Sequence, residues 1–512
     1  MPRFYSLPAE IQSMILNFVA EPSPTSSTQN TSCLFPYACV DRLWNKVFEA
    51  IIFKSLTITQ NDILPLSHIM RGHRRSLLKH LWLRIRLPEY PTPEFKKEED
   101  PRVLWELDSV FTKSIFSLWD VLSGWDSTGR KGMTLELSAD SPSDWAGVLL
   151  DNCSTDKDVE LYKTYLASGS TEQYDAAEDI HTPYVNLHKA LGTTSGYLTN
   201  KRRDEYCETA HEETVQELGP QLAPVSVVTK FLIRRQQFRE IYPTALNKIL
   251  GSLSAVQDIH VERWRCAESH DEKAWCKEAQ ITFGMDLPPS AKRLCLYGET
   301  SKIFHTWEAK EAAVVSLAKS MRQYTKDLEH LSISHLIDAK EFLRPSWLAN
   351  SDKGASSPDW KNLKTLSLTS DIFNSGTKKE INNLLCAAAR AAKRMPNLQK
   401  FEIWNDDEER ACVFCYRAED TVGEIIWRGT RVKTLDNEVV RVWAVTSIIN
   451  NRPDVRELFE PIDEDVVARN VLKYLSSKDQ ALHPVSACRQ IDRNTTDDDD
   501  RQVDKEKQNA TK

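Results

Sequence analysis

Two short motifs in the chain have the residue types of a zinc site. His211-Glu212-Glu213-Thr214-Val215 begins like a zinc-protease helix, in which two histidines four positions apart bind the metal from one face. Val215 stands where the second histidine is required, so this segment does not predict such a site. Cys412-Val413-Phe414-Cys415 has the spacing of two zinc ligands, but no second Cys or His pair follows. A strand would point the two thiols to opposite faces, so we interpret them as structural cysteines.

A wider set of metal-ligand types, His260, Cys266, His270 and Cys276, has a spacing that matches no familiar zinc site, and we rank zinc binding there far below a structural role. The chain also lacks the GxSxG, P-loop and HExxH sequences. These observations predict a protein that is not an enzyme and that needs no metal or cofactor. A catalytic group assembled from distant residues is the remaining alternative.

The strongest pattern is a repeated six-residue motif in which the first, fourth and sixth residues are apolar. Successive copies are 35, 37, 35 and 35 residues apart and begin at Val256, Ala291, Leu328, Leu363 and Leu398. Near-constant steps are typical of stacked structural units. Earlier copies are spaced irregularly and lie near Phe53, Leu78 and Leu135.

Each copy predicts a strand, because its last two apolar residues are two positions apart and therefore share one face. The segments 109–122, 308–324 and 379–395 carry apolar stripes at helical spacing. Stacked helix-strand units with parallel strands predict an α/β fold, an irregular leucine-rich-repeat-like solenoid with a period longer than usual. A doubly wound sheet is the alternative, but no Gly-rich phosphate loop follows any of the short strands.

The strand residues between the paired apolar positions should form the exposed, concave face of the solenoid. On this reading the face carries Trp82, Glu136, His260, Cys295, Ser332, Ser367 and Glu402, and Trp404 is among the residues that flank it. Polar groups mixed with exposed aromatic side chains suit recognition of another protein. We therefore predict target binding by Trp82, Glu136, His260, Glu402 and Trp404. The alternative is that Trp82 and Trp404 are covered and belong to the core.

Composition restricts the class of partner and the compartment. The net charge of the 512 residues is -8, which argues against nucleic acid or an anionic membrane as the main partner. There is no apolar run of 18 residues and no signal-peptide core, and the 11 cysteines show no disulfide framework. These features predict a cytoplasmic or nuclear protein with reduced thiols.

Composition also divides the chain. Residues 53–477 would form the solenoid, interrupted by a polar insertion at about 151–224 whose role the sequence does not reveal. Residues 478–512 include Asp497 to Asp500 and are polar, so we expect a disordered tail.

The first 52 residues predict two amphipathic helices. Pro8 fits a helical N-terminal turn, and Ile11, Met14, Ile15 and Phe18 follow at helical spacing. A second apolar stripe includes Val40 and Trp44. A unit of about 50 residues has too little interior to bury both stripes, so the remaining apolar surface predicts a partner.

These two helices resemble an F-box, the helical hook that the Skp-family adaptor of cullin-RING ubiquitin ligases binds. The matching positions are Leu7, Pro8, Ile11, Ile15, Val40 and Trp44, although the connection 21–35 is longer and more polar than usual. An F-box before irregular repeats resembles a large fungal family of F-box proteins. The resemblance implies a substrate-recognition subunit of an SCF-type ligase, holding the adaptor by residues 1–52 and a target protein by the solenoid. The alternative is a protein-binding scaffold outside any ligase.

Overall fold

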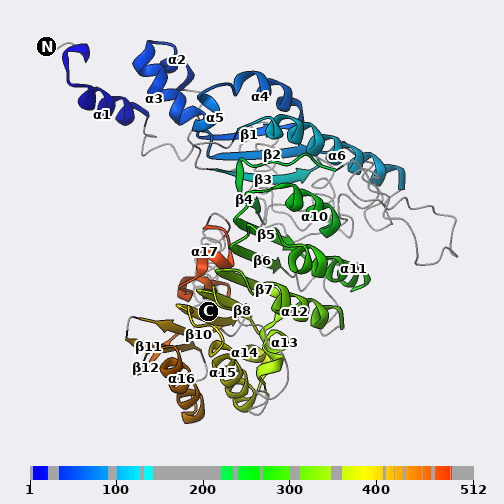
Figure 1. Cartoon of the computed structure of the whole chain (residues 1–512), viewed down its shortest axis with the longest axis vertical. Coiled ribbons are helices and arrows are strands. Elements are labelled where there is room, and N and C mark those ends of the chain that lie inside the picture. The colour runs from blue at the N-terminus through cyan, green and yellow to red at the C-terminus, as the bar shows by residue number, and fades with distance from the viewer. Residues whose placement is uncertain are drawn as a thin grey trace, which may run out of the picture. The chain divides into compact units, whose positions relative to one another are not determined.

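The computed structural model describes residues 4–20, 34–89, 101–126, 132–141, 221–234, 240–265, 269–299, 312–347, 360–406, 411–419, 421–430, 434–452, 454–462, 468–484 and 486. The chain divides into two compact units, and Figure 1 labels its helices and strands. The first unit contains 1–182, 220–232 and 252–255, and the second contains 183–219, 233–251 and 256–512. The twelve described strands are mostly parallel and alternate with helices, an α/β arrangement like that of leucine-rich repeats.

The first unit begins with what we call the N-terminal hook, the described residues from Phe4 to Ile52, which contain η1 (Phe4–Ser6) and three α-helices. The α-helices are α1 (Ala9–Ala20), α2 (Phe35–Ala38) and α3 (Arg42–Ile52). Strand β1 (Ser55–Thr59) follows α3 with only Phe53 and Lys54 between them. The first predicted amphipathic helix corresponds to α1. The second is divided into α2 and α3 with Val40 in the turn between them, because Asp41 caps the start of α3. The first strand is entered directly from the hook.

The rest of the first unit is a parallel sheet with helices. Strand β1 pairs with β2 (His80–Arg86), β2 with β3 (Met133–Asp140), and β3 with β4 (Val228–Ile233). The short helices α4 (Ile63–Ile69) and α5 (Arg74–Leu77) and the long helix α6 (Pro101–Ser123) connect them. Helix α6 contains the predicted segment 109–122 but begins earlier, because Pro101 fits its first turn.

The second unit contains the regular repeats. Its first five strands are β5 (Asp258–Trp264), β6 (Arg293–Glu299), β7 (His330–Asp338), β8 (Thr365–Thr369) and β9 (Lys400–Asp406). The main helices are α10 (Pro243–Ser252), α11 (Ser269–Gln280), α12 (Ala312–Tyr324) and α15 (Lys378–Ala392). Shorter turns are η7 (Ile281–Met285), α13 (Ala339–Phe342), η8 (Arg344–Ser346) and α14 (Ile372–Ser375).

The predicted repeat phase is confirmed in this region. Each apolar residue that opens a copy lies two positions before its strand and is buried, as Leu363 before β8 illustrates. In register across parallel strands, Leu331 pairs with Leu366 and Leu366 with Phe401. All three side chains are at most 1% exposed, so the paired apolar positions form the core between strands and helices.

The parallel order ends after β9. Strands β10 (Ala411–Ala418) and β11 (Val422–Gly429) form an antiparallel hairpin on β9, and β12 (Asp454–Pro461) then pairs parallel with β11 after helix α16 (Asn437–Ile449). This departs from the predicted uniform repeat. A hairpin needs only a short turn, whereas a parallel step needs a crossover, and Glu419 to Thr421 is too short for one.

The predicted tail boundary after residue 477 is wrong. The described residues 468–484 and 486 form what we call the C-terminal strap, which contains η10 (Ala468–Tyr474) and α17 (Lys478–Ala481). Ala481 and Leu482 are fully buried, so an apolar contact orders a segment of polar composition. Within the second unit, α17 lies on the opposite side of the strands from α11 and α12 (Figure 1).

No helix among the described residues has the length and apolar character that crossing a membrane requires. Most of the predicted insertion, from 151 to 220, lies outside the described residues, as do 487–512.

Candidate partner-binding surfaces

The N-terminal hook is organised around Asp41, which caps α3. Its carboxylate accepts hydrogen bonds from the backbone N–H groups of Leu43 (2.7 Å) and Trp44 (3.0 Å). The Tyr5 hydroxyl also donates to Asp41, at 2.6 Å. These bonds, the one from Tyr5 first, hold the pKa of Asp41 below its usual value. The cap therefore fixes both the start of α3 and the chain before α1.

Trp44 lies at the centre of an aromatic cluster inside the hook. Its ring is stacked with those of Tyr37 and Phe48, with centroids 5.9 and 5.6 Å apart, and tilted against Phe4 at 6.0 Å. Phe48 is fully buried, whereas Trp44 is half-buried. Trp44 therefore packs within the hook as well as facing solvent.

The apolar side chains around this cluster are exposed. Ile11 is 42% exposed, Ile15 38% and Val40 54%, while Pro8 is exposed and Leu7 half-buried. Helices α1 and α3 are in contact, so the six predicted adaptor-binding residues lie on one small helical unit. Further apolar side chains are exposed on the same unit, namely Met14, Phe18, Val19, Phe35 and Tyr37. Met14 and Phe18 belong to the predicted apolar stripe of α1, so their spacing in the sequence already indicated apolar surface at these positions.

The predicted target-binding residues on the strands are buried, which corrects the expectation of an exposed face. In the first unit, Trp82 is 6% and Glu136 1% exposed. The indole of Trp82 donates to the Ser138 hydroxyl at 2.9 Å, and His80 is bonded to the Glu136 carboxylate at 2.8 Å. These groups face neighbouring strands, so cross-strand partners satisfy them.

In the second unit the same correction applies to His260, Glu402 and Trp404, which are 8%, 0% and 1% exposed. The physical cause is the C-terminal strap, which covers this side of the strands. We call this side, opposite the helices, the strap face. The alternative reading, in which Trp404 is a core residue, is the one that the structure supports.

The middle of the strap, at Ser476 and Ser477, is bonded to Glu402 on β9. The backbone N–H groups of Ser476 (2.8 Å) and Ser477 (3.0 Å) donate to its two carboxylate oxygens, and both serine hydroxyls donate as well. Nearby, the Lys400 ammonium donates to the Ser476 carbonyl at 2.9 Å. A carboxylate with four donors is compensated for its burial without a cationic partner.

The C-terminal end of the strap is bonded to Glu262 on β5. The Glu262 carboxylate accepts from the His483 N–H at 2.5 Å and the Ser486 hydroxyl at 2.7 Å, and it is paired with His260 at 2.8 Å. Burial lowers the pKa of His260, but its hydrogen bonds to Cys295 and Glu262 outweigh this and raise it to about 10. Burial raises the pKa of Glu262, and the bond to His260 outweighs this and lowers it to about 2. The pair is therefore ionised at neutral pH.

An apolar cluster also holds the strap, with side chains on both sides of Ser476 and Ser477. Trp404 of β9, Val413 of β10 and Tyr297 of β6 pack with strap side chains that are all at most 4% exposed, namely Val471, Leu472, Leu475, Ala481 and Leu482. The hydroxyl of Thr365 on β8 donates to Gln480 at 2.7 Å. The strap thus crosses the strands, contacting β9 and β10 first and β5 last.

Beneath the strap lies a row of polar residues in register. His260 pairs with Cys295, Cys295 with Ser332, Ser332 with Ser367, and Ser367 with Glu402. Among the described residues, the buried hydroxyls of Ser332, Ser334 and Ser367 have no hydrogen-bond partner. The strap therefore provides hydrogen-bond partners at the two ends of this row of residues. Among the described residues, it provides none for the serine hydroxyls at the centre of the row.

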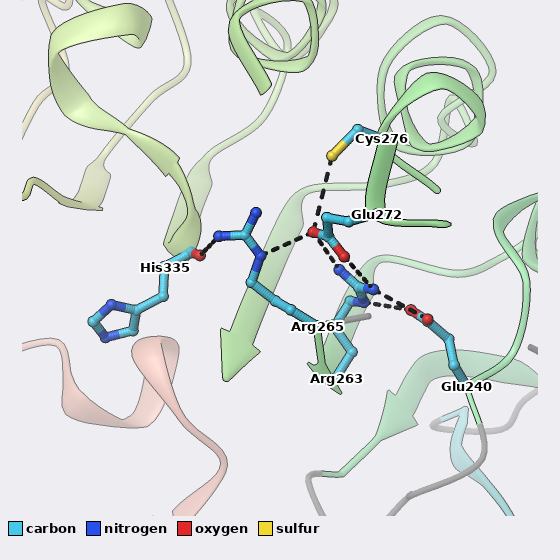
Figure 2. A network of polar contacts seen from close by, with 6 residues as sticks. All are labelled: Glu240, Arg263, Arg265, Glu272, Cys276 and His335. Carbon is cyan, nitrogen blue, oxygen red and sulfur yellow. Dashed lines mark hydrogen bonds and ion pairs between the residues drawn. The ribbon is translucent and has the colours of Figure 1, made fainter. Parts of the chain in front are cut away.

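A separate ionic network lies on the helix side of β5 (Figure 2). The Arg263 guanidinium bridges Glu240 and Glu272, with 2.9 and 3.0 Å bonds to Glu272, and Arg265 donates to Glu272 at 2.9 Å. All four side chains are at most 6% exposed, and Arg263 lies 3.8 Å from the Trp275 ring centroid. Two cations and two anions balance, so the network joins β5 to α11 and Glu240 without a net buried charge.

The cysteines and histidines considered as metal ligands are dispersed. His260 contacts the strap, Cys276 lies in α11 near Glu272, and the His270 side chain is 78% exposed. As predicted, Cys412 and Cys415 face opposite ways, towards Phe373 and Ser476 respectively. Burial raises the pKa of the Cys276 and Cys415 thiols to about 12. In the described parts of the chain no group of three or more such residues is arranged to hold a metal. Cys266 and His211 lie outside those parts.

Comparison with known proteins identifies one segment. Residues 286–483 match a family described only as a family of unknown function, DUF6546. The match includes β6 to β12 and most of the C-terminal strap, and it does not include the N-terminal hook. No curated protein matches the chain.

Proposed function

We propose that the chain is the substrate-recognition subunit of an SCF-type cullin-RING ubiquitin ligase, with the N-terminal hook as an F-box that binds a Skp-family adaptor. The observation that carries this proposal is the exposed apolar surface of the hook, where Ile11, Ile15 and Val40 are 38–54% exposed. Scattered single apolar residues on a surface need no explanation, but many exposed apolar side chains on one small helical unit indicate a partner.

The hook residues have distinct parts in this proposal. Ile11, Ile15 and Val40 would be covered by the adaptor, with Leu7 and Pro8 at the start of α1. Trp44 would support the surface from its aromatic cluster and contribute its open edge. The ligase core would transfer ubiquitin, so no catalytic residue, metal or cofactor comes from this chain. The protein would act in the cytoplasm or nucleus.

The test replaces exposed residues, because truncating Trp44 would also disturb the packing of Phe48. Ile11→Glu with Ile15→Glu places two carboxylates on the α1 surface. We expect recovery of purified Skp-family adaptor to fall at least tenfold, since a large buried interface anchor commonly contributes about 2 kcal/mol or more. Leu64→Glu, at a position 69% exposed on α4, is the matched control and should leave adaptor recovery unchanged.

Equal adaptor recovery with the folded double variant would refute the F-box assignment. A scaffold outside any ligase is distinguished in the same experiment by adding a cullin. An adaptor complex that binds the cullin supports the ligase function, whereas an adaptor complex that excludes it supports the scaffold.

A further inference from the structure

The C-terminal strap has the character of a bound ligand on the second unit. It lies across strands that are already paired with each other, and its bonds to Glu402 and Glu262 are made by backbone N–H groups and short hydroxyls. Only residues 463–467 separate it from Ile462 after β12. A tether of this length gives an effective concentration on the order of millimolar, so modest contacts are sufficient to keep the strap in place.

The fit of the strap is incomplete where it crosses the centre of the row. The hydroxyls of Ser332, Ser334 and Ser367 are at most 1% exposed and find no partner among the described residues. Leaving a buried hydroxyl unpaired costs roughly 1–3 kcal/mol. A peptide that supplied donors or acceptors at these positions would bind the face better than the strap does.

We propose that the strap face is the target-binding site of the protein and that the C-terminal strap occupies it in competition with a target peptide. This rests on the function proposed above, in which the chain holds a target. The peptide would cross the strands as the strap does, with apolar side chains in the places of Leu475 and Leu482 and an unmodified Ser-Ser pair in the place of Ser476 and Ser477.

The chemistry of the two anchoring carboxylates selects this class of peptide. Glu402 and Glu262 each accept from a backbone N–H and a serine hydroxyl, and Glu262 is also neutralised by His260. A phosphoserine in place of Ser477 would set about two negative charges against the fully buried Glu402. Phosphorylated and acidic peptides are therefore excluded, and phosphorylation of the target segment would prevent capture.

The test uses the full chain and a labelled synthetic peptide with the sequence of residues 468–486. Ser477→Glu should release the strap by placing a carboxylate against Glu402. Lys478→Gln changes the net charge by the same amount at the neighbouring, exposed position and is the control. We expect the peptide to bind Ser477→Glu at least tenfold more tightly than it binds the wild type or Lys478→Gln. The same peptide carrying phosphoserine at position 477 should bind at least tenfold more weakly.

Hydrogen exchange on the wild type decides the matter even if Ser477→Glu fails to fold. The amides of Ser477 and His483 should exchange through an opening that leaves the β7 and β8 amides protected. If strap and strand amides exchange only together, the strap is a permanent part of the fold and the proposal is overturned. It is also overturned if the phosphorylated peptide binds better, or if Ser477→Glu forms dimers that the peptide does not dissociate, since a second copy is then the occupant. None of these readouts involves the adaptor, so they fail independently of the ligase proposal.

Discussion

The N-terminal hook and the strap face invert the usual relation between polarity and exposure. In the hook, Phe18 and Met14 are 76% and 66% exposed, whereas on the strap face Glu262 and Glu402 are completely buried. The hook is too small to cover its own apolar residues, while the strap face is covered by a segment from the end of the chain. On the two proposals above, the exposed apolar group marks an open binding surface, and the buried carboxylates with backbone donors mark an occupied one.

The two regions also differ in what a substitution should change. Substitutions around the strands should lower the free energy of unfolding of the second unit, because the charged groups there depend on particular partners. Substitutions on the exposed hook should change binding and leave unfolding almost unaltered.

The largest expected effect is on the ionic network of Figure 2. Arg263→Met leaves Glu240 and Glu272 with much less compensation and should lower the free energy of unfolding by about 3–5 kcal/mol. The control is Arg441→Met, since Arg441 pairs with Glu438 in solvent, at 72% and 59% exposure, and should change it by less than about 1 kcal/mol. Urea denaturation measures both. Equal effects would mean that burial does not strengthen this network.

A neighbouring pair of residues on β8 separates the two sides of the sheet. Leu366→Ala should cost about 2–5 kcal/mol, because it leaves a cavity between strand and helix. Ser367→Ala should not lower stability and is expected to raise it by up to about 1–3 kcal/mol, because it removes a buried hydroxyl that has no partner within the described residues. Denaturation of the two variants side by side tests this, and a large loss in Ser367→Ala would reveal a partner for the hydroxyl.

The pH dependence should come from the ion pair under the strap, where Cys295 and His483 also face His260. The pKa of His260 is raised from 6.5 to about 10, so its contribution to stability is complete below pH 6.5 and is lost as the pH rises through about 10. The pKa of Glu262 is lowered from 4.5 to about 2, so its contribution is present above pH 4.5 and is lost as the pH falls through about 2.

The pair should therefore stabilise the protein most between pH 4.5 and 6.5. His260→Gln should flatten the decline of the free energy of unfolding between pH 6.5 and 9, measured by denaturation at several pH values. A decline as steep as that of the wild type would assign the effect to other groups.

The smallest effect is expected on the hook. Ile11→Ser should change the free energy of unfolding by less than about 0.5 kcal/mol, because Ile11 is 42% exposed. Leu16→Ala on the same helix should cost about 2–5 kcal/mol, because Leu16 is fully buried. Thermal unfolding distinguishes them. A loss of similar size in both variants would show that Ile11 is already packed within the chain.

Sequence patterns predicted the parts of the fold that depend on local periodicity. The phase of Leu331, Leu366 and Phe401 followed from spacing alone, since side chains two apart on a strand share a face. The same parity placed Glu402 and Trp404 on the side away from the helices, but it carried no information about what covers that side. Their cover is Ser476, Leu475 and neighbouring strap residues about 70 positions away, and the polar composition there favoured a tail.

The separation in sequence between Glu262 and its strap partners has a consequence for protein synthesis. Its donors, His483 and Ser486, are 221 and 224 residues downstream. At about 5–20 residues per second, the ribosome needs roughly 10–45 s to reach them after Glu262 has been made. During that time the strap face of β5 remains accessible to water and to chaperones. A premature stop codon before Ser476 would leave both Glu262 and Glu402 without their strap donors for the lifetime of the truncated chain.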